Sequence, residues 1–172
     1  GAARIASEAA RRGEVVDAGA VHARKVANFR AAVLREGIAP RPGVLDMLDA
    51  ARNAGVAVGW VTTTGRHTVD LMLEGLDGAI TAESFDFICD RDDVEAPKPA
   101  PDVYALALER ARVGIDEALV IEDTPESAEA ASSIGIATVG FPGWAAEGRR
   151  FPPGVRSVPR LSPGLLLARQ SA

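Results

Sequence analysis

The sequence lacks several features that would point to particular classes of protein. Its 172 residues contain one cysteine, Cys89, which excludes a framework of internal disulfides. The formal net charge is −5, which argues against a nucleic-acid partner because such proteins usually carry a basic stripe. No apolar run approaches membrane-spanning length, and there is no internal repeat or low-complexity tract. The expectation is a soluble, cytoplasmic protein with no nucleic-acid or membrane partner.

The chain has enough apolar residues to form the core of one domain, with a small appendage, since 47% of it is hydrophobic. Residues 2–11 and 17–35 are predicted as a helical hairpin, with Asp17 as the N-cap of the second helix and Gly37 at its end. The proline-rich turn at residues 40–43 marks a boundary. We therefore expect a helical part over residues 1–39 and a core over residues 40–172.

Strands and helices alternate in the pattern from residue 43 to residue 140. Apolar runs predict strands at residues 56–61, 85–89, 118–121 and 136–139, an edge strand at 155–158, and intervening helices near 44–52, 67–73, 102–112 and 126–134. A terminal helix is predicted over 161–169. Such alternation is typical of βαβ units, so the predicted fold class is α/β with a doubly wound, Rossmann-like parallel sheet.

Two adjacent carboxylates, Glu122 and Asp123, follow the 118–121 strand. Ligands of open α/β sheets bind just beyond the carboxyl ends of the strands. Neighbouring carboxylates repel each other unless a cation lies between them, and Mg²⁺ is a natural candidate. The alternative is that these residues only start the loop and cap the helix after Pro125.

Thr62 follows the predicted 56–61 strand, and Lys98 lies in the loop after the predicted 85–89 strand. Both are therefore expected at the same edge of the sheet as the two carboxylates. A hydroxyl and an ammonium group can hold phosphate oxygens. Each residue alone has an ordinary explanation, because Thr62 suits a strand and a lone lysine is usually solvated. Their shared placement after strand ends favours the functional interpretation.

Four stretches carry a resemblance to a known family: residues 41–44, 58–62, 98–104 and 120–124. In this order they resemble the haloacid dehalogenase superfamily, in the form typical of its β-phosphoglucomutase and sugar-phosphate phosphatase branch. The resemblance implies that Thr62 binds the transferring phosphoryl group and that Lys98 neutralises it and orients the nucleophile. It also implies that Glu122 and Asp123 bind Mg²⁺.

Further contacts follow from the same resemblance. Thr63, Thr64 and Arg66 match a loop that contacts a second substrate phosphate in this branch. Residues 1–39 resemble the remainder of a small helical cap on an α/β core. Lys25 matches a cap lysine that faces the substrate, and the alternative for it is an ordinary solvated helix lysine.

The chain departs from the family pattern at one point. The superfamily's first motif, Asp-x-Asp-Gly-Thr at the end of a strand, does not occur among these residues. That motif supplies the nucleophile and the general acid–base, and its strand is the central one, between the 56–61 and 118–121 strands. Without it, those two strands lose their shared neighbour. A longer natural chain, with this motif upstream, is the expectation.

The expected function is therefore that of a Mg²⁺-dependent phosphatase. It would act on a small phosphorylated sugar or related metabolite through an aspartyl-phosphate in the full-length parent. Two alternatives stay open: a phosphosugar mutase of the same branch, and a non-catalytic domain that keeps the fold.

Overall fold

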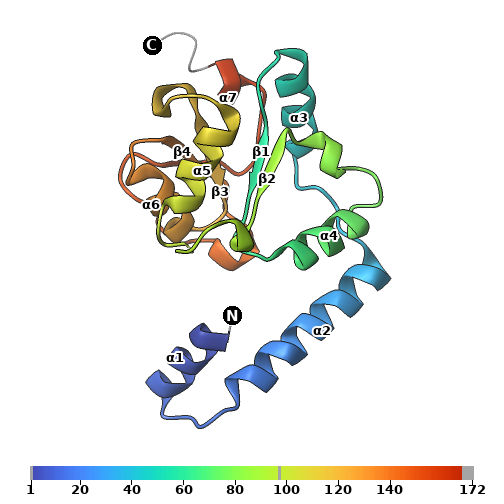
Figure 1. Cartoon of the computed structure of the whole chain (residues 1–172), viewed down its shortest axis with the longest axis vertical. Helices are drawn as coiled ribbons and strands as arrows, with labels where there is room; N and C mark the ends of the chain where they lie inside the picture. Colours follow the sequence, from blue (N-terminus) through green and yellow to red (C-terminus); the bar gives the residue numbers. More distant parts are fainter. Residues whose placement is uncertain (1, 97, 168–172) are drawn as a thin grey trace.

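The computed structural model describes residues 2–96 and 98–167 and shows a helical hairpin attached to an α/β core (Figure 1). The helices are α1 (Ala2–Arg12), α2 (Ala18–Glu36), α3 (Val44–Asn53), α4 (Arg66–Gly75), α5 (Asp102–Ala111), α6 (Pro125–Ser132) and α7 (Gly164–Leu167). The strands are β1 (Gly59–Val61), β2 (Phe87–Cys89), β3 (Leu119–Glu122), β4 (Ala137–Gly140) and β5 (Arg156–Ser157). Short 3₁₀ turns lie at η1 (Ala82–Ser84), η2 (Arg91–Asp93), η3 (Ile115–Glu117) and η4 (Trp144–Ala146).

The hairpin of α1 and α2 has the helix ends that its sequence predicts. The Asp17 side chain caps α2 by accepting a hydrogen bond from a backbone N–H of the first turn at 2.9 Å. Gly37 ends α2 with a φ of 70° and donates to the carbonyl of Val33. Val33 lies where a side chain on Gly75 of α4 would stand, and the N–H of Ile38 donates to the Gly75 carbonyl at 2.6 Å. The C-terminal end of α2 is thus the part of the hairpin that packs on the core.

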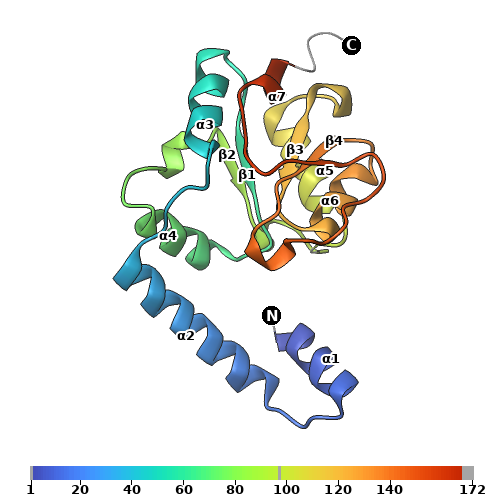
Figure 2. The same cartoon turned by 180° about the vertical axis from the view of Figure 1, so that it is seen from behind.

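The parallel strands form two separate sheets, of order β1-β2 and β3-β4-β5. Within the described ranges, no backbone ladder joins β1 to β3, although both views show these strands on facing sides of the core (Figures 1 and 2). The α/β class with parallel strands is confirmed. The division of the sheet lies where the sequence predicts the loss of a shared neighbour.

Burial of the strands follows this division. In β4, which has a neighbour on each side, Thr138, Val139 and Gly140 are buried. In β1, Gly59 is exposed and the other two residues are half-buried, and β3 is half-buried over residues 119–121. The prediction of a buried strand over residues 56–61 is therefore wrong: the strand is shorter, and Val56 is 41% exposed. The physical reason is that, among the residues the structure describes, no strand pairs with the second edge of β1.

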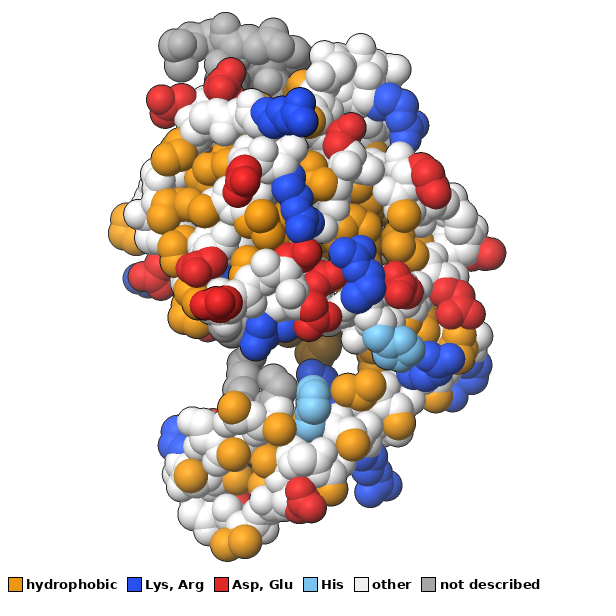
Figure 3. All heavy atoms as spheres, viewed as in Figure 1, with side chains coloured by type: hydrophobic (Ala, Val, Ile, Leu, Met, Phe, Trp, Pro, Cys, Tyr) orange, Lys and Arg blue, Asp and Glu red, His pale blue; other side chains and the backbone are white. Residues whose placement is uncertain are grey.

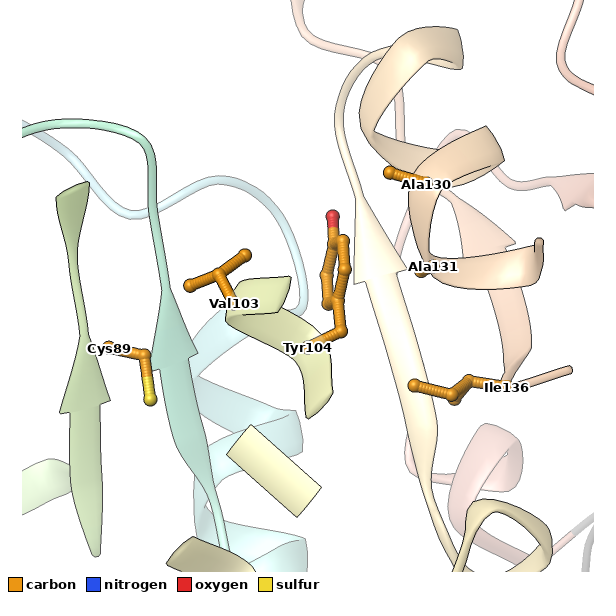
Figure 4. Close-up of a cluster of buried hydrophobic side chains, with 6 residues drawn as sticks. All are labelled: Cys89, Val103, Tyr104, Ala130, Ala131 and Ile136. Atoms are coloured by element: carbon orange, nitrogen blue, oxygen red, sulfur yellow. The ribbon is translucent and has the colours of Figure 1, made fainter. Parts of the chain in front are cut away.

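Helices cover both faces of the strands, which is the doubly wound arrangement. The side chain of Val120 joins a cluster with α5 and α6, drawn in Figure 4, where Tyr104 is fully buried. Its neighbours Leu119 and Ile121 point to the opposite face and pack with Met47 of α3 and with α7. Alternate residues of β3 therefore serve two apolar layers.

The proline-rich turn before α3 is held by contacts with two later segments of the chain, after β4 and before α7. Arg41 donates to the carbonyls of Phe141 and Pro142 at 2.9 and 2.6 Å, and its guanidinium lies 3.4 Å from the Phe141 ring centroid. Leu161 donates its N–H to the Pro42 carbonyl at 3.3 Å. The predicted terminal helix is found over residues 164–167, and its last two residues, 168 and 169, lie outside the described ranges. No described helix is long and apolar enough to cross a membrane.

Candidate active site

The carboxyl ends of the strands point toward the helical hairpin. Figure 1 shows β1 running from the α3 end of the core toward the hairpin, and β2 runs parallel to it. On the surface, acidic and basic side chains gather at this end of the core, with a hollow between it and the hairpin (Figure 3). The loops that follow the strands therefore meet at one end of the core.

Lys98 and Glu122 form a buried ion pair at this end. Lys98 Nζ lies 2.7 Å from Glu122 Oε1, and the two side chains are 8% and 9% exposed. The alternative that Lys98 is an ordinary solvated lysine is wrong, because its side chain is removed from water. A lysine is buried in this way when a partner offsets its charge, which Glu122 does here.

Tyr104 of α5 is a third member of this group, and the sequence analysis assigned it no role in the site. Its hydroxyl lies 2.6 Å from Glu122 Oε1 and 2.9 Å from the Ser127 carbonyl oxygen. Lys98 Nζ lies 4.6 Å from the centroid of its ring. Burial, followed by the negative charge of Glu122, raises the pKa of Tyr104 far above its usual value. The signal for this role was present, since a tyrosine on an inward helix face needs a partner for its hydroxyl.

Asp123 differs from its neighbour in being exposed. The alternative that Glu122 and Asp123 cap the next helix is wrong, because Thr124 is the N-cap of α6 and accepts from the Ser127 N–H at 3.4 Å. The Asp123 carboxylate stands close enough to Arg41 to act on its charge, although burial is the larger effect and lowers the pKa of Arg41.

The carboxylates of Glu122 and Asp123 are the donors at this end that a Mg²⁺ ion would require. Within the described residues, no group of three or more His, Cys, Asp or Glu side chains is arranged to hold a metal. Mg²⁺ commonly takes one or two carboxylates and completes its shell with water and substrate phosphate. Asp123 meets that requirement, whereas Oε1 of Glu122 is already engaged by Lys98 and Tyr104. Of the two carboxylates, Asp123 is therefore the one more open to a cation.

The loop after β1 places hydroxyl groups at the same end. Thr62 continues the pairing with β2 by donating its N–H to the Cys89 carbonyl at 2.8 Å. Its Oγ1 lies 2.7 Å from Oγ1 of Thr64 and accepts the Thr64 N–H at 3.2 Å. Thr63 is exposed. The loop is therefore held in a defined turn, with Thr63 directed to solvent.

Arg66 begins α4 and is tied to the loop after β2. Its Nε lies 2.8 Å from Oδ2 of Asp90, and its backbone N–H donates to Asp92 Oδ2 at 3.2 Å. The sequence analysis assigned no role to Asp90 and so missed this contact. A carboxylate directly after a strand was the available signal.

Lys25 lies apart from these groups. It is exposed on α2 and lines a cavity of about 500 Å³ inside the hairpin. The other lining residues are Ile5, Glu8, Ala9, Arg12, Glu14, Val16, Val21 and His22. The structure therefore brings Lys98 and Glu122 into direct contact, sets Thr62 and Asp123 in loops at the same end, and leaves Lys25 in the hairpin.

A Rossmann-like core with a lysine, hydroxyl groups and carboxylates at one strand edge defines a class of proteins that bind anionic ligands. The chain belongs to the haloacid dehalogenase-like hydrolase family, whose sequence pattern matches residues 6–141. The predicted membership of this superfamily is confirmed.

Individual relatives point to one branch of that family. The chain is 36% identical over 129 residues to the plasmid-encoded protein CbbY of Cupriavidus necator, covering 75% of this chain and 50% of that protein. It is 33% identical over 109 residues to the phosphoglycolate phosphatase of Escherichia coli K12, covering 63% of this chain and 42% of that enzyme. A crystal structure of CbbY from Rhodobacter sphaeroides with xylulose-(1,5)bisphosphate matches with a TM-score of 0.72 and 30% identity, over 83% of this chain and 64% of that one. The chain spans about half the length of the CbbY proteins it matches.

Proposed function

We propose that the whole protein is a Mg²⁺-dependent phosphatase that acts on a small phosphorylated sugar or related metabolite. The observation that carries this proposal is the buried Lys98–Glu122 pair beside the strand ends. A lysine held in this way presents a fixed positive charge in a site with little water, where charge stabilisation is strongest. Relatives named as CbbY and phosphoglycolate phosphatase support the substrate class.

The described residues would bind the phosphoryl group and the metal in the following way. Lys98 neutralises the phosphoryl oxygens and is held in place by Glu122, which is itself fixed by the Tyr104 hydroxyl. Thr62 donates a hydrogen bond to the same phosphoryl group from its turn after β1. Asp123, with the free oxygen of Glu122, would hold Mg²⁺, which when bound offsets negative charge on the phosphate.

The chemistry also needs a nucleophile. We propose that an aspartate enters on a strand between β1 and β3, where the two sheets are not joined by a ladder in the described part of the chain. Its carboxylate oxygen would form a bond to phosphorus as the ester oxygen leaves, and water would then hydrolyse the aspartyl-phosphate. We further propose that residues 1–39 belong to a cap over a core of residues 40–172, with Lys25 reaching the substrate from the cap.

The first test is phosphate release by the whole protein from sugar monophosphates, sugar bisphosphates and phosphoglycolate, with Mg²⁺ and with EDTA. Lys98→Ala and Asp123→Ala are each expected to lower kcat by about 100-fold or more, because each removes a charge that faces the transferring group. Asp70→Ala, at an exposed carboxylate of α4, is the matched control and should retain activity. Full activity in either site variant would overturn the assignment.

The same experiment separates the alternatives. A mutase returns the phosphoryl group to the sugar, so an isomeric sugar phosphate would accumulate in place of free phosphate. The 172 residues alone are expected to release none, because no described residue occupies the position of the nucleophile between β1 and β3.

A further inference from the structure

Trp144 is an exposed aromatic residue that the proposed chemistry does not use. It opens the 3₁₀ turn η4 and is 91% exposed. Among the described residues of the α/β core, the next most exposed large apolar residues are between 40% and 42% exposed: Leu45, Val56 and Ile115. A lone exposed apolar side chain is ordinary on a protein surface, so the location of Trp144 decides what its exposure means.

The turn that carries Trp144 lies at the same strand edge as the candidate site. The N–H of Phe141, directly after β4, donates to the Glu122 carbonyl at 2.7 Å. A Cβ on Gly143 would lie 3.9 Å from Oδ2 of Asp123. Both views show the turn, in orange after β4, at the end of the core nearest α1 (Figures 1 and 2). Trp144 is therefore one residue from a backbone position that borders the Asp123 carboxylate.

Contacts on both sides hold this turn in place. Arg41 donates to the carbonyls of Phe141 and Pro142 before the turn. Ala146, at the end of the turn, is buried, and its N–H donates within the turn at 2.9 Å. Binding residues are commonly carried by loops that a rigid scaffold positions. The turn thus presents Trp144 without having to become ordered when a ligand binds.

We propose that Trp144 is a specificity-determining residue that packs on the carbon skeleton of the substrate while Lys98 and Thr62 bind the phosphoryl group. The C–H groups of a sugar can lie against an indole ring, and aromatic side chains are common in the walls of ligand sites. Inorganic phosphate has no such apolar surface. The proposal rests on the proposed function for the substrate class, and it adds the residue that recognises the carbon part.

The competing explanation is that another part of the protein covers Trp144. Helix α1 lies opposite the turn, across the hollow between the core and the hairpin (Figures 1 and 3). A contact of that kind would stabilise the protein without ligand and would not distinguish a sugar phosphate from inorganic phosphate. Loss of the indole would then lower the thermal stability and change the affinity for both ligands equally, or for neither.

The test measures the Kd of the whole protein for xylulose 5-phosphate and for inorganic phosphate, by calorimetric titration in EDTA. Trp144→Ala is expected to raise the Kd for xylulose 5-phosphate about tenfold, because the apolar surface that covers the sugar is lost. It should leave the Kd for inorganic phosphate unchanged. Trp144→Phe keeps an aromatic face and should stay within about threefold of the wild type.

Ile115→Ala is the matched control. Ile115 is a large apolar residue that is 40% exposed, and it lies in η3, before β3 and thus at the opposite end of the strands. Its substitution should leave both Kd values unchanged. The proposal is overturned if Trp144→Ala changes neither Kd, if it changes both equally, or if Ile115→Ala has the same effect.

Intrinsic fluorescence reports the contact directly. The other tryptophan of the 172 residues, Trp60, packs on Phe85 with 5.4 Å between the ring centroids. Xylulose 5-phosphate is expected to change the emission of the wild type, and Trp144→Phe should remove that change while the ligand still binds. An emission change of the same size in Trp144→Phe would contradict the contact.

Equilibrium binding keeps this test independent of turnover. If the wild type releases no phosphate from any sugar phosphate, the proposed phosphatase function fails. A Kd for xylulose 5-phosphate that rises in Trp144→Ala still supports the role of Trp144 in that case. A wild type that binds inorganic phosphate as tightly as xylulose 5-phosphate contradicts that role.

Discussion

Glu122 is the residue on which the polar contacts of Lys98 and Tyr104 converge. Both Lys98 and Tyr104 contact the same oxygen, Oε1, at 2.7 and 2.6 Å. Removing one partner of a buried ion pair leaves an uncompensated charge, which typically costs about 3–5 kcal/mol. Activity lost in Lys98→Ala must therefore be compared with the thermal stability of the same variant, which circular dichroism measures.

Tyr104 makes this group sensitive to alkaline pH. Because burial and Glu122 raise its pKa, the folded state keeps the phenol proton that the unfolded state releases near pH 10. The stabilisation is present below about pH 10 and lost as the pH rises above it. Above about pH 10, we expect the free energy of unfolding to fall with pH more steeply in the wild type than in Tyr104→Phe. The difference in slope should be about 1.4 kcal/mol per pH unit.

Urea unfolding at a series of pH values measures this difference. The chain has a single tyrosine, so the ultraviolet absorbance of phenolate reports Tyr104 alone. Parallel stability curves for the two proteins, or phenolate formation near pH 10 in the folded protein, would contradict the expectation.

At the scale of elements, the turn before α3 lies very close to the C-terminal segment. Gly43 has a φ of 87°, and a Cβ on it would lie 2.1 Å from the Leu161 carbonyl oxygen. The turn therefore needs glycine for two reasons, the backbone conformation and the close approach of the C-terminal segment.

Gly43→Ala should separate these reasons when it is compared with Gly55→Ala. Gly55 has a φ of 65°, but nothing lies within 4 Å of a Cβ there. Gly55→Ala is expected to cost about 1–2 kcal/mol of unfolding free energy, the usual cost of a left-handed residue. Gly43→Ala should cost clearly more, because Leu161 must also move. Chemical denaturation measures both, and equal costs would show that the turn adapts without strain.

For the whole molecule, the divided sheet is the dominant feature. Helix α5 carries Tyr104 and Val103 into a cluster that also receives Val61 of β1 and Val120 of β3. Side-chain packing by α5 thus links the two sheets where backbone pairing between them is absent in the described chain. Unpaired strand edges also leave polar backbone groups without partners.

We expect the 172-residue chain alone to unfold in a broad transition, with rapid amide exchange in β1 and β3 compared with β4. The reason is that, in residues 2–96 and 98–167, β4 has a strand on each side, whereas β1 and β3 each have one. Thermal circular dichroism and hydrogen exchange measure these properties. A sharp, cooperative transition with equal protection of the three strands would show that the packing of α5 suffices.

The features that could be predicted from the sequence are those that depend on residues close together in the chain. The caps at Asp17 and Gly37, the alternation of strands and helices, and the polar residues after the strands all rest on neighbours in the chain. These were found within a few residues of their predicted places. The resemblance to the family was carried by the same short stretches and is confirmed by the match over residues 6–141.

By itself, the sequence determined the α/β class, the family and the residues that stand at the strand ends, because hydrophobic period, turn residues and motif order are local properties. Only the tertiary structure decided that Lys98 is buried against Glu122, that Tyr104 completes the pair, and that Arg66 pairs with Asp90. It also decided that the predicted buried strand at 56–61 is short and accessible. Burial and partner choice depend on residues distant in the sequence, and no local pattern contains that information.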